Sequence, residues 1–414
     1  MRVHIIGGGI IGLSAAWYLR KEGFEVTVID AQDLKEGTSH GNAGMIVPSH
    51  FIPLAAPGVI AKGIKWMFSR KSPFYIKPRL SLELVEWLWT FYRSCSHAHV
   101  ERAMPVLRDY NLWSRQLYSE LASHPDFRFC FEQKGILMLF KEAKTEAEEF
   151  ELADQAAELG LEAQKLSAAA TQALEPGLRL DVRGSVYFPG DAHLYPNLLI
   201  RQLTTALKSQ GVEFLTGAAV TDFDTVNGKI SRLQLSTGQV VPVEKVVLAA
   251  GSWSAGLMKK LGLKLLLQDG KGYSVTLSSP EKRPGIPALL SEAKVAVTPM
   301  GDDLRIGGTL EISNFSPQVD RLRFQGIMES LPRYYPELNS GWQDLSKVWH
   351  GYRPCSPDGL PYMGFSKKHD NLLVATGHAM MGLSLGPATG RMVADLMIGK
   401  QPEVKLDLFD PARF

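Results

Sequence analysis

Residues 3–12, VHIIGGGIIG, decide the fold of the amino-terminal region. Their first four residues are an apolar run typical of a buried strand, and residues 13–21 then have apolar side chains at helical spacing. Residues 25–29 form a second apolar run that ends at Asp30, whose carboxylate can accept hydrogen bonds from the hydroxyls of a ribose. A strand, a glycine-rich turn, a helix, a strand and an acid in this order predict a β-α-β unit that binds a dinucleotide.

The glycines of this unit fit the pattern G-x-G-x-x-G, and each has a physical role. Gly7 permits a tight turn, Gly9 lets a pyrophosphate approach the backbone, and Gly12 lets the helix pack closely on the strand. The first amides of the helix, at Ile10 and Ile11, and the positive end of its dipole are expected to face the phosphates. The unit predicts a dinucleotide but does not distinguish FAD from NAD.

Further segments rich in small residues favour FAD. Residues 37–44, GTSHGNAG, are placed to continue along the pyrophosphate and reach a flavin, although a flexible linker is the simpler interpretation. Residues 245–253 and 372–390 each combine a buried strand with a small-residue turn, and the second turn leads into an amphipathic helix whose N-terminus can stabilise a reduced flavin. Strand-like runs within residues 212–220 are expected to flank the adenine. The residues predicted to contact the cofactor in these segments are Ser39, Asn42, Ala43, Gly44, Met45, Val220, Ala250, Gly251, Gly377, Gly382, Leu383 and Ser384.

Composition and charge exclude several classes of protein. The 414 residues suggest two or three domains, and 45% hydrophobic with 21% charged residues is the composition of a globular chain. The 45 Lys and Arg residues against 43 Asp and Glu residues leave a net charge of +2, which argues against a nucleic-acid partner. The three cysteines are far apart and no cluster has the spacing of metal ligands, so neither a disulfide framework nor a metal site is predicted. No leader peptide or membrane span is recognised, and a cytoplasmic protein is expected.

Five motifs in order along the chain resemble those of one family: the glycines of residues 7–12, residues 39–44, residues 271–274 (KGYS), residues 351–361 (GYRPCSPDGLP) and residues 377–390. With these motifs the chain resembles, over nearly its whole length, the FAD-dependent amino-acid oxidoreductases of the D-amino-acid oxidase fold. Within that family the resemblance is greatest to bacterial D-amino-acid dehydrogenases, with glycine and sarcosine oxidases as more distant relatives.

The resemblance implies an α/β protein with a Rossmann-like FAD-binding domain and an inserted α+β substrate domain built on an antiparallel sheet. The FAD-binding domain is expected to be discontinuous, with residues 1–50, 191–262 and 345–414, and the substrate domain to comprise residues 51–190 and 263–344. The substrate domain is predicted to have strands at residues 127–140, 184–188, 271–277, 294–299 and 304–312 and a helix at residues 318–331.

The expected chemistry needs mainly orientation, because a hydride moves from the substrate Cα to flavin N5. Arg353 is the predicted clamp, since a guanidinium matches a carboxylate in two hydrogen bonds and the family's arginine in this segment binds the substrate carboxylate. A structural ion pair is the alternative. Tyr273 and His378 are predicted to help bind and orient the substrate, although either could be purely structural. His50 and Tyr352 are expected to line the pocket, and no acid or base is predicted, because hydride transfer from a neutral amine does not require one.

The resemblance implies non-covalent FAD, although His40 in the flavin loop raises the question of a covalent link. It also implies a small D-amino or D-imino acid as substrate, with D-proline, cis-4-hydroxy-D-proline and D-alanine as candidates, and a quinone or other carrier as electron acceptor. An oxygen-dependent oxidase of the glycine or sarcosine type and a non-catalytic flavoprotein or NAD-binding scaffold remain as alternatives. Residues 57–70, with Lys62, Lys65 and Arg70, suggest a basic amphipathic helix on the inner face of a membrane, or else a helix that covers the substrate domain. The oligomeric state is not predicted.

Overall fold

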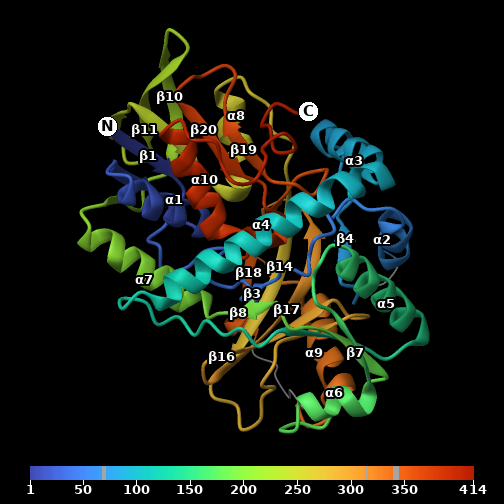
Figure 1. Ribbon diagram of the computed structural model, residues 1–414. Helices are drawn as coiled ribbons and strands as arrows, with labels where there is room; N and C mark the ends of the chain where they lie inside the picture. The colour runs from blue at the N-terminus through green and yellow to red at the C-terminus, as the bar shows by residue number, and fades with distance from the viewer. Residues whose placement is uncertain (68–70, 314, 317, 339–344) are drawn as a thin grey trace.

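A parallel sheet and a largely antiparallel sheet organise the protein (Figure 1). The computed structural model describes residues 1–67, 71–313, 315–316, 318–338 and 345–414. The parallel sheet has the strand order β19-β20-β13-β1-β2-β9, in which β1 pairs in parallel with both β2 and β13 and only the edge strand β19 is antiparallel. Its strands are β1 (Arg2–Ile6), β2 (Glu25–Ile29), β9 (Glu213–Leu215), β13 (Lys245–Leu248), β19 (Tyr362–Phe365) and β20 (Leu372–Thr376).

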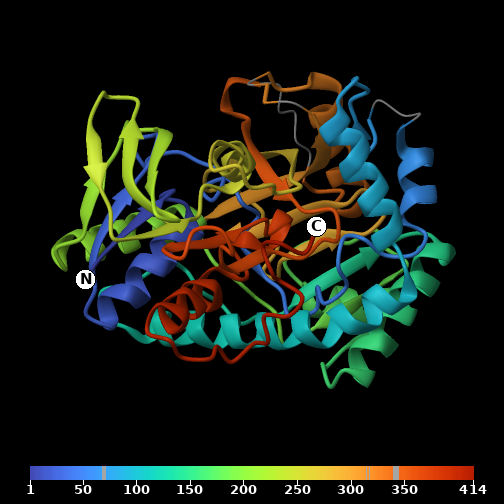
Figure 2. The same ribbon diagram turned by 90° about the horizontal axis from the view of Figure 1, so that it is seen from above.

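Helices α1 (Ile10–Lys21) and α10 (Gly386–Met397) pack together against this sheet. Gly390 allows their backbones to come close, because a Cβ at this position would lie 2.4 Å from the backbone carbonyl carbon of Ser14. Helix α4 (His97–Ser123) packs on α10 from the outside, and in Figure 2 it runs along one side of the molecule beneath both sheets. The β1-α1-β2 unit predicted from residues 3–30 is therefore confirmed, and the sheet is buried on both faces, as parallel sheets are.

The second sheet has the strand order β18-β14-β17-β16-β15-β5-β7-β6, with β4 beside β17. Its strands are β4 (Phe74–Ile76), β5 (Ile136–Phe140), β6 (Gln164–Ser167), β7 (Gly184–Phe188), β14 (Gln268–Leu277), β15 (Ala288–Leu290), β16 (Val295–Met300), β17 (Asp303–Ile312) and β18 (Trp349–Cys355). Most neighbours are antiparallel, whereas β15 pairs in parallel with β5 and β4 in parallel with β17. The predicted α/β architecture with an antiparallel second sheet is confirmed.

Smaller elements complete the fold. A β-meander of β10 (Val220–Val226), β11 (Lys229–Leu235) and β12 (Val240–Pro242) lies outside the parallel sheet, so the prediction that the strand at Val220 simply flanks the adenine missed this separate sheet. Strands β3 (Met45–Ile46) and β8 (Ala192–His193) pair with each other. The remaining helices are α2 (Val59–Met67), α3 (Leu82–Ser94), α5 (Ala143–Glu158), α6 (Ala168–Leu174), α7 (Pro196–Ser209), α8 (Ser254–Lys260) and α9 (Arg321–Tyr334), with 3-10 turns η1 (Gly251–Trp253), η2 (Leu345–Lys347) and η3 (Ala379–Gly382).

Some predicted boundaries differ from the structure for local reasons. The helix expected over residues 318–331 begins at Arg321, because the side chain of Asp320 caps it by accepting from the amides of Leu322 and Arg323. The strand expected over residues 127–140 is confined to β5, and Phe127 instead packs in the core beneath α1.

The domain division stays a prediction. Helix α4, which it assigns to the substrate domain, buries Tyr110 and Tyr118 in the core shared by α1 and α10. Of the segment expected to form a basic amphipathic helix, Arg70 lies outside the described residues. No helix in the described part of the chain is long and apolar enough to cross a membrane.

Candidate active site

A cavity of about 2040 Å³ connects the two sheets. It begins at the carboxyl ends of β1, β2 and β13, passes the loop of residues 39–43 and the turn of residues 378–384, and reaches strands β14, β17 and β18. Its volume exceeds the 300–1,000 Å³ usual for a pocket of one small ligand. Of the predicted site residues it is lined by Gly7, Gly9, Ile10, Ile11, Asp30, Ser39, Asn42, Ala43, Met45, His50, Val220, Ala250, Gly251, Tyr273, Tyr352, Arg353, His378, Gly382, Leu383 and Ser384. Gly12, Gly44 and Gly377 lie outside the lining and contribute through backbone packing.

The glycines of the turn at the start of the cavity serve two different purposes, close packing and access for a ligand. A Cβ on Gly7, whose φ is +110°, would lie 2.4 Å from the carbonyl oxygen of Ala249, and a Cβ on Gly12 would lie 1.8 Å from the carbonyl oxygen of Gly7. A Cβ on Gly9, by contrast, would meet Ser39 Oγ at an ordinary 3.4 Å. Gly7 and Gly12 are thus required by the protein's own packing, whereas Gly9 leaves the backbone open to the cavity.

Asp30 closes the turn from the end of β2. Its Oδ2 accepts from the amide of Gly8 at 2.6 Å and its Oδ1 from the amide of Gln32 at 2.8 Å. Each carboxylate oxygen retains a further lone pair for a ligand hydroxyl. Gly8 was not predicted as a site residue; a Cβ there would lie 2.2 Å from Leu34 Cδ2, the end of a flexible side chain that would have to move, and 3.2 Å from Asp30 Oδ2.

The loop of residues 39–43 is fixed from the antiparallel sheet. Arg305 on β17 donates to the carbonyl oxygens of His40 and Asn42 at 2.7 and 2.8 Å, and Ser274 on β14 donates to the carbonyl of Gly41 at 2.9 Å. In a trans peptide the carbonyl and the following amide point in opposite directions, so the amides of residues 41 and 43 point away from Arg305. The loop thereby turns amide donors away from the sheet, in a segment that lines the cavity.

Arg305 was missed by the sequence analysis. It is 4% exposed, and it is also held by Thr276 Oγ1 and Asn197 Oδ1. Burial lowers the pKa of Arg305 to about 10, so the guanidinium stays charged at neutral pH. Nothing in the alternating sequence of β17 marks this arginine, because its partners lie in distant segments.

Replacing Arg305 by methionine should weaken FAD binding by about 10- to 100-fold, because hydrogen bonds from a charged donor that position the loop are lost. The measurement is the Kd of the apoprotein for FAD, together with the rise in Tm that FAD produces. Arg201→Met, at an exposed position on α7, is the matched control and should bind FAD as the wild type does. An unchanged Kd in the Arg305 variant would show that the loop holds its shape without this side chain.

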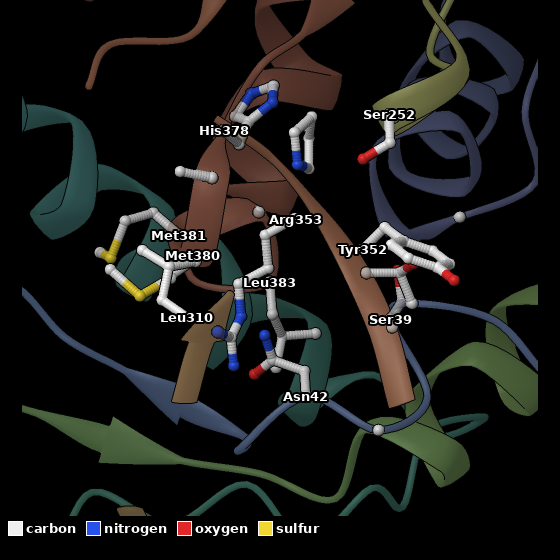
Figure 3. Close-up of a pocket in the computed structure, with 18 of the residues that line it drawn as sticks. Ser39, Asn42, Ser252, Leu310, Tyr352, Arg353, His378, Met380, Met381 and Leu383 are labelled. Atoms are coloured by element: carbon white, nitrogen blue, oxygen red, sulfur yellow. The ribbon is translucent and has the colours of Figure 1, made fainter. Parts of the chain in front are cut away.

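Arg353 projects into the cavity from β18 (Figure 3). Its Nη1 donates to the carbonyl of Thr309 at 2.5 Å, and a Cβ on Gly272 would lie 2.3 Å from its Nη2, so the glycine makes room for the guanidinium. Among the residues that the structure describes, no carboxylate lies within the 4.0 Å of an ion pair with it. Burial lowers the pKa of Arg353, but a guanidinium remains protonated. The structural ion pair considered as an alternative is thus not formed with any described residue.

Thr309 has an unusual backbone at this point. Its φ of 68° lies in the left-handed region, which is costly for a β-branched residue. The carbonyl that it presents is the acceptor for Arg353. Strain of this kind often occurs at functional sites, which is consistent with a role in aiming the guanidinium.

Tyr273 lies on β14, next to the Gly272 that makes room for Arg353. The ring of Tyr273 packs in the core beneath α9, in the buried cluster that contains Phe324 and Ile327. Its hydroxyl donates to Glu311 at 3.0 Å and accepts from the amide of Asp320 at 3.3 Å. Although Tyr273 touches the cavity, the structure does not bring its hydroxyl to Arg353.

His378 follows β20 at the start of the turn of residues 378–384 (Figure 3). Its Nε2 lies 3.0 Å from Thr389 Oγ1, which donates its own proton to the carbonyl of Leu385 and also contacts Tyr110 Oη. Because the hydroxyl proton of Thr389 is committed, Nε2 of His378 must be the donor, and Nδ1 carries the lone pair. Burial lowers the pKa of His378 to about 3, so the ring is neutral.

Tyr352 forms part of an aromatic group at the cavity wall. Its hydroxyl donates to the carbonyl of Ser316 at 2.6 Å, and its ring meets Phe315, which in turn stacks on Trp253. The expectation that Tyr352 and His50 line the pocket agrees with their positions.

The cavity as a whole fits FAD. A dinucleotide needs three features along one path, and all three are present. They are a turn with no Cβ where the pyrophosphate approaches, an acid at the end of β2, and a loop that directs amides away from the sheet. The chamber beyond them has room for a flavin and for a small carboxylate beside Arg353. Together, the parallel sheet and this cavity define a dinucleotide-binding enzyme.

Comparisons with known proteins agree with this class. A family model described as FAD dependent oxidoreductase matches residues 2–396, and the chain belongs to that family. The chain is 33% identical over 420 residues to a D-amino acid dehydrogenase of Methylobacterium nodulans, with 100% of this chain and 99% of that protein covered. Among solved structures, glycine oxidase from Geobacillus kaustophilus has a TM-score of 0.80 at 24% identity, and that from Bacillus cereus has 0.77 at 25%; each match covers 100% of this chain and 99% of the other.

The prediction of FAD rather than NAD and the resemblance to the D-amino-acid oxidase fold are therefore confirmed, and the protein is an FAD-dependent oxidoreductase. The individual contacts predicted between side chains and FAD remain predictions.

Proposed function

We propose that this protein dehydrogenates a small D-amino or D-imino acid, of the D-proline, cis-4-hydroxy-D-proline or D-alanine type. The observation that carries the proposal is the guanidinium of Arg353, a cation that faces the cavity with no carboxylate of the described chain as its partner. A substrate carboxylate completes it in two parallel hydrogen bonds. The D configuration is supported by the names of relatives that match over the full length.

The chain's own residues then orient the substrate. Arg353 holds the carboxylate, while Met380, Met381 and Leu310 line the chamber with apolar side chains (Figure 3). His378 is held neutral and fixed in one tautomer by Thr389. FAD, when bound, supplies the acceptor for the hydride that leaves the substrate Cα. We propose that FAD is held non-covalently, so that acid precipitation releases all of it into the supernatant.

Anaerobic addition of substrate tests this function. The purified protein should have the visible spectrum of oxidised flavin, and D-proline, cis-4-hydroxy-D-proline or D-alanine should bleach it, whereas the L enantiomers should not. Bleaching by L enantiomers alone would overturn the stereochemistry. A flavin spectrum that no amino or imino acid changes would overturn the substrate class.

The electron acceptor is proposed to be a quinone or another carrier, and the names of dehydrogenase relatives support this. The alternative of an oxygen-dependent amine oxidase is supported by the likeness to glycine oxidase from Bacillus cereus. Admitting air to the bleached protein separates them. Slow return of the colour without hydrogen peroxide supports the dehydrogenase, whereas return within one turnover with stoichiometric peroxide supports the oxidase.

We propose further that the acceptor is met at a membrane surface. Helices α2 and α3 stand at the same end of the molecule in both views (Figures 1 and 2). On α3, Leu82, Val85 and Trp89 are 88%, 61% and 61% exposed, while the opposite face of the helix buries Trp87, whose Nε1 donates to the carbonyl of Cys355 at 2.9 Å. An outward row of large apolar side chains on a helix anchored by its other face suits insertion among lipid headgroups.

Introducing charge on this face of α3 should weaken binding to membranes. Val85→Glu and Trp89→Glu together should reduce co-sedimentation with anionic phospholipid vesicles by about tenfold or more, since a carboxylate must leave water to insert. Val226→Glu, on β10, alters a side chain that is 59% exposed at the other end of the molecule and serves as the control. Equal sedimentation of all three proteins would refute a membrane role for α3.

A further inference from the structure

A buried hydrogen-bonded row of side chains lies between the cavity and α4. Asp191 Oδ2 accepts from Ser49 Oγ at 2.5 Å and its Oδ1 accepts from the amide of Ser49 at 3.0 Å. His50 Nδ1 lies 3.2 Å from the same Ser49 Oγ. Since the hydroxyl proton of Ser49 is directed at the carboxylate, Ser49 Oγ must accept from His50, whose proton is therefore on Nδ1. Nε2 of His50 is left with the lone pair.

The His50 end of the row borders the cavity. His50 lines the cavity on a segment with fixed contacts at both ends. On one side the amide of Val47 donates to Ser384 Oγ in the turn of residues 378–384. On the other side Leu54 packs in the cluster that contains Leu310, the residue after Thr309, whose carbonyl accepts from Arg353. Four residues of extended chain span at most about 14 Å, which limits how far His50 can lie from these two anchors. His50, Arg353 and His378 all line the one cavity.

The surroundings of His50 suit the body of a small substrate. Met138, Leu289 and Ala296 line the same cavity from β5, β15 and β16. Side chains of this kind pack against an aliphatic or cyclic substrate but accept no proton. Burial, together with the charge of Lys294 in the turn before β16, lowers the pKa of His50 to about 4, so its ring is neutral and able to accept.

Asp191 is at the other end of the hydrogen-bonded row from His50. Burial raises the pKa of Asp191 to about 7, against the opposing effects of its hydrogen bonds with Ser49 and of the charge of Arg115 on α4. Two further ionisable residues, Glu149 on α5 and Lys294, line the cavity. Burial raises the pKa of Glu149, against the opposing charge of Lys294. Asp191 is thus a carboxylate above neutral pH and able to take a proton.

A substrate that arrives as an ammonium requires such an acceptor, whereas the neutral amine considered in the sequence analysis does not. Hydride leaves the substrate Cα as the amine lone pair forms the C=N bond, and an ammonium has no lone pair to give. An amino acid arrives mainly as the ammonium at neutral pH. A buried site that accepts it must hold the released proton on a group of its own.

We propose that His50, backed by Ser49 and Asp191, removes the ammonium proton of the substrate. This inference rests on the proposed function. The substrate proton passes to His50 Nε2, the proton on His50 Nδ1 passes to Ser49 Oγ, and the proton of Ser49 passes to Asp191 Oδ2. The products are a neutral amine, a histidine with its proton on Nε2 and a protonated Asp191, so charge and protons balance. After the imino product leaves, Asp191 returns its proton by the reverse route, and His50 Nε2 releases it to water that enters the emptied cavity.

The pH dependence of kcat/KM tests the relay. In the wild type, kcat/KM should fall about tenfold per pH unit below a pKa near 7, because the active form of Asp191 is the carboxylate. In Asp191→Asn this acid limb should disappear and the remaining activity should follow the ionisation of the substrate amine alone. His50→Gln should be about 10²- to 10³-fold slower at pH 7. Its deficit should shrink steadily as the pH approaches the amine's own pKa, since the substrate then arrives neutral.

A merely structural role for His50 would give a deficit that is the same at every pH, and this result would overturn the proposal, as would wild-type activity in His50→Gln. His97→Gln, at an exposed position on α4, is the matched control. Tetrahydrofuran-2-carboxylate, which lacks the amine, should perturb the flavin spectrum of His50→Gln and wild type with the same Kd, so an intact carboxylate site is shown separately. Failure of the proposed function would be distinguishable from failure of the relay, because in that case no amino acid would reduce the flavin of the wild-type protein.

Discussion

Replacing Arg353 by methionine should lower kcat/KM for the D-amino acid by about 10³- to 10⁴-fold, which corresponds to about 4–5.5 kcal/mol of transition-state stabilisation. The guanidinium fixes the carboxylate and with it the direction of the Cα–H bond, so both binding and orientation are lost. Arg353→Lys keeps the charge but not the planar fork, and an intermediate loss of about 10²-fold is expected. Steady-state kinetics of the FAD-loaded variants provide the measurement.

The same substitution should leave the fold intact. Arg353 is a desolvated cation without a carboxylate partner in the described chain, and such a charge costs stability rather than adding to it. Methionine fills a similar volume, so the Tm of Arg353→Met should equal or exceed that of the wild type. A variant that is inactive but also markedly less stable would point to a structural role, and a stable variant with wild-type kcat/KM would refute the clamp.

The position of the guanidinium can be tested without removing it. A methyl group on Gly272 would lie 2.3 Å from Nη2 and 2.5 Å from Cζ of Arg353, so Gly272→Ala forces the side chain from its place. Activity should fall by about tenfold or more, chiefly through KM. Gly177→Ala, where a Cβ meets nothing within 4 Å, is the control.

The parts of the site that the sequence predicts are those whose geometry is local. The turn of Gly7, Gly9 and Gly12 with Asp30 is formed within one β-α-β unit, so the spacing alone determines which atoms face the cavity. Arg353 was identified by the resemblance of its segment and not by any periodicity.

The parts that escaped prediction depend on contacts between distant segments. Arg305 on β17 contacts the loop of residues 39–43 only because the antiparallel sheet lies against that loop, and Asp191 contacts Ser49 only because β3 pairs with β8. Tyr273 was placed beside the substrate because its strand borders the site, but its face depends on the register of β14, which contains a bulge between Lys271 and Tyr273. One residue of register exchanges the two faces of a strand, and a single sequence does not fix that register.

Gly9→Ala and Gly12→Ala, each a gain of one methyl group, should separate the cofactor-binding role of the turn from its packing role. In Gly12→Ala the methyl group would lie 1.8 Å from a backbone oxygen that cannot rotate away, so the apoprotein should lose about 3 kcal/mol of unfolding free energy or more, measured by denaturant titration. In Gly9→Ala the methyl group has 3.4 Å to its nearest neighbour, and the apoprotein should stay within about 1 kcal/mol of the wild type.

Both variants can lose affinity for FAD, but for different reasons. The methyl group of Gly9→Ala occupies the space through which the pyrophosphate approaches the first amides of α1, so the Kd for FAD should rise by about 10²-fold although the apoprotein is folded. Any loss of FAD in Gly12→Ala should instead follow its loss of stability and be recovered under conditions that restore folding. A Gly9→Ala protein that binds FAD as tightly as the wild type would mean that the phosphates do not approach the backbone at this residue, and the path of the dinucleotide along the turn would have to be redrawn.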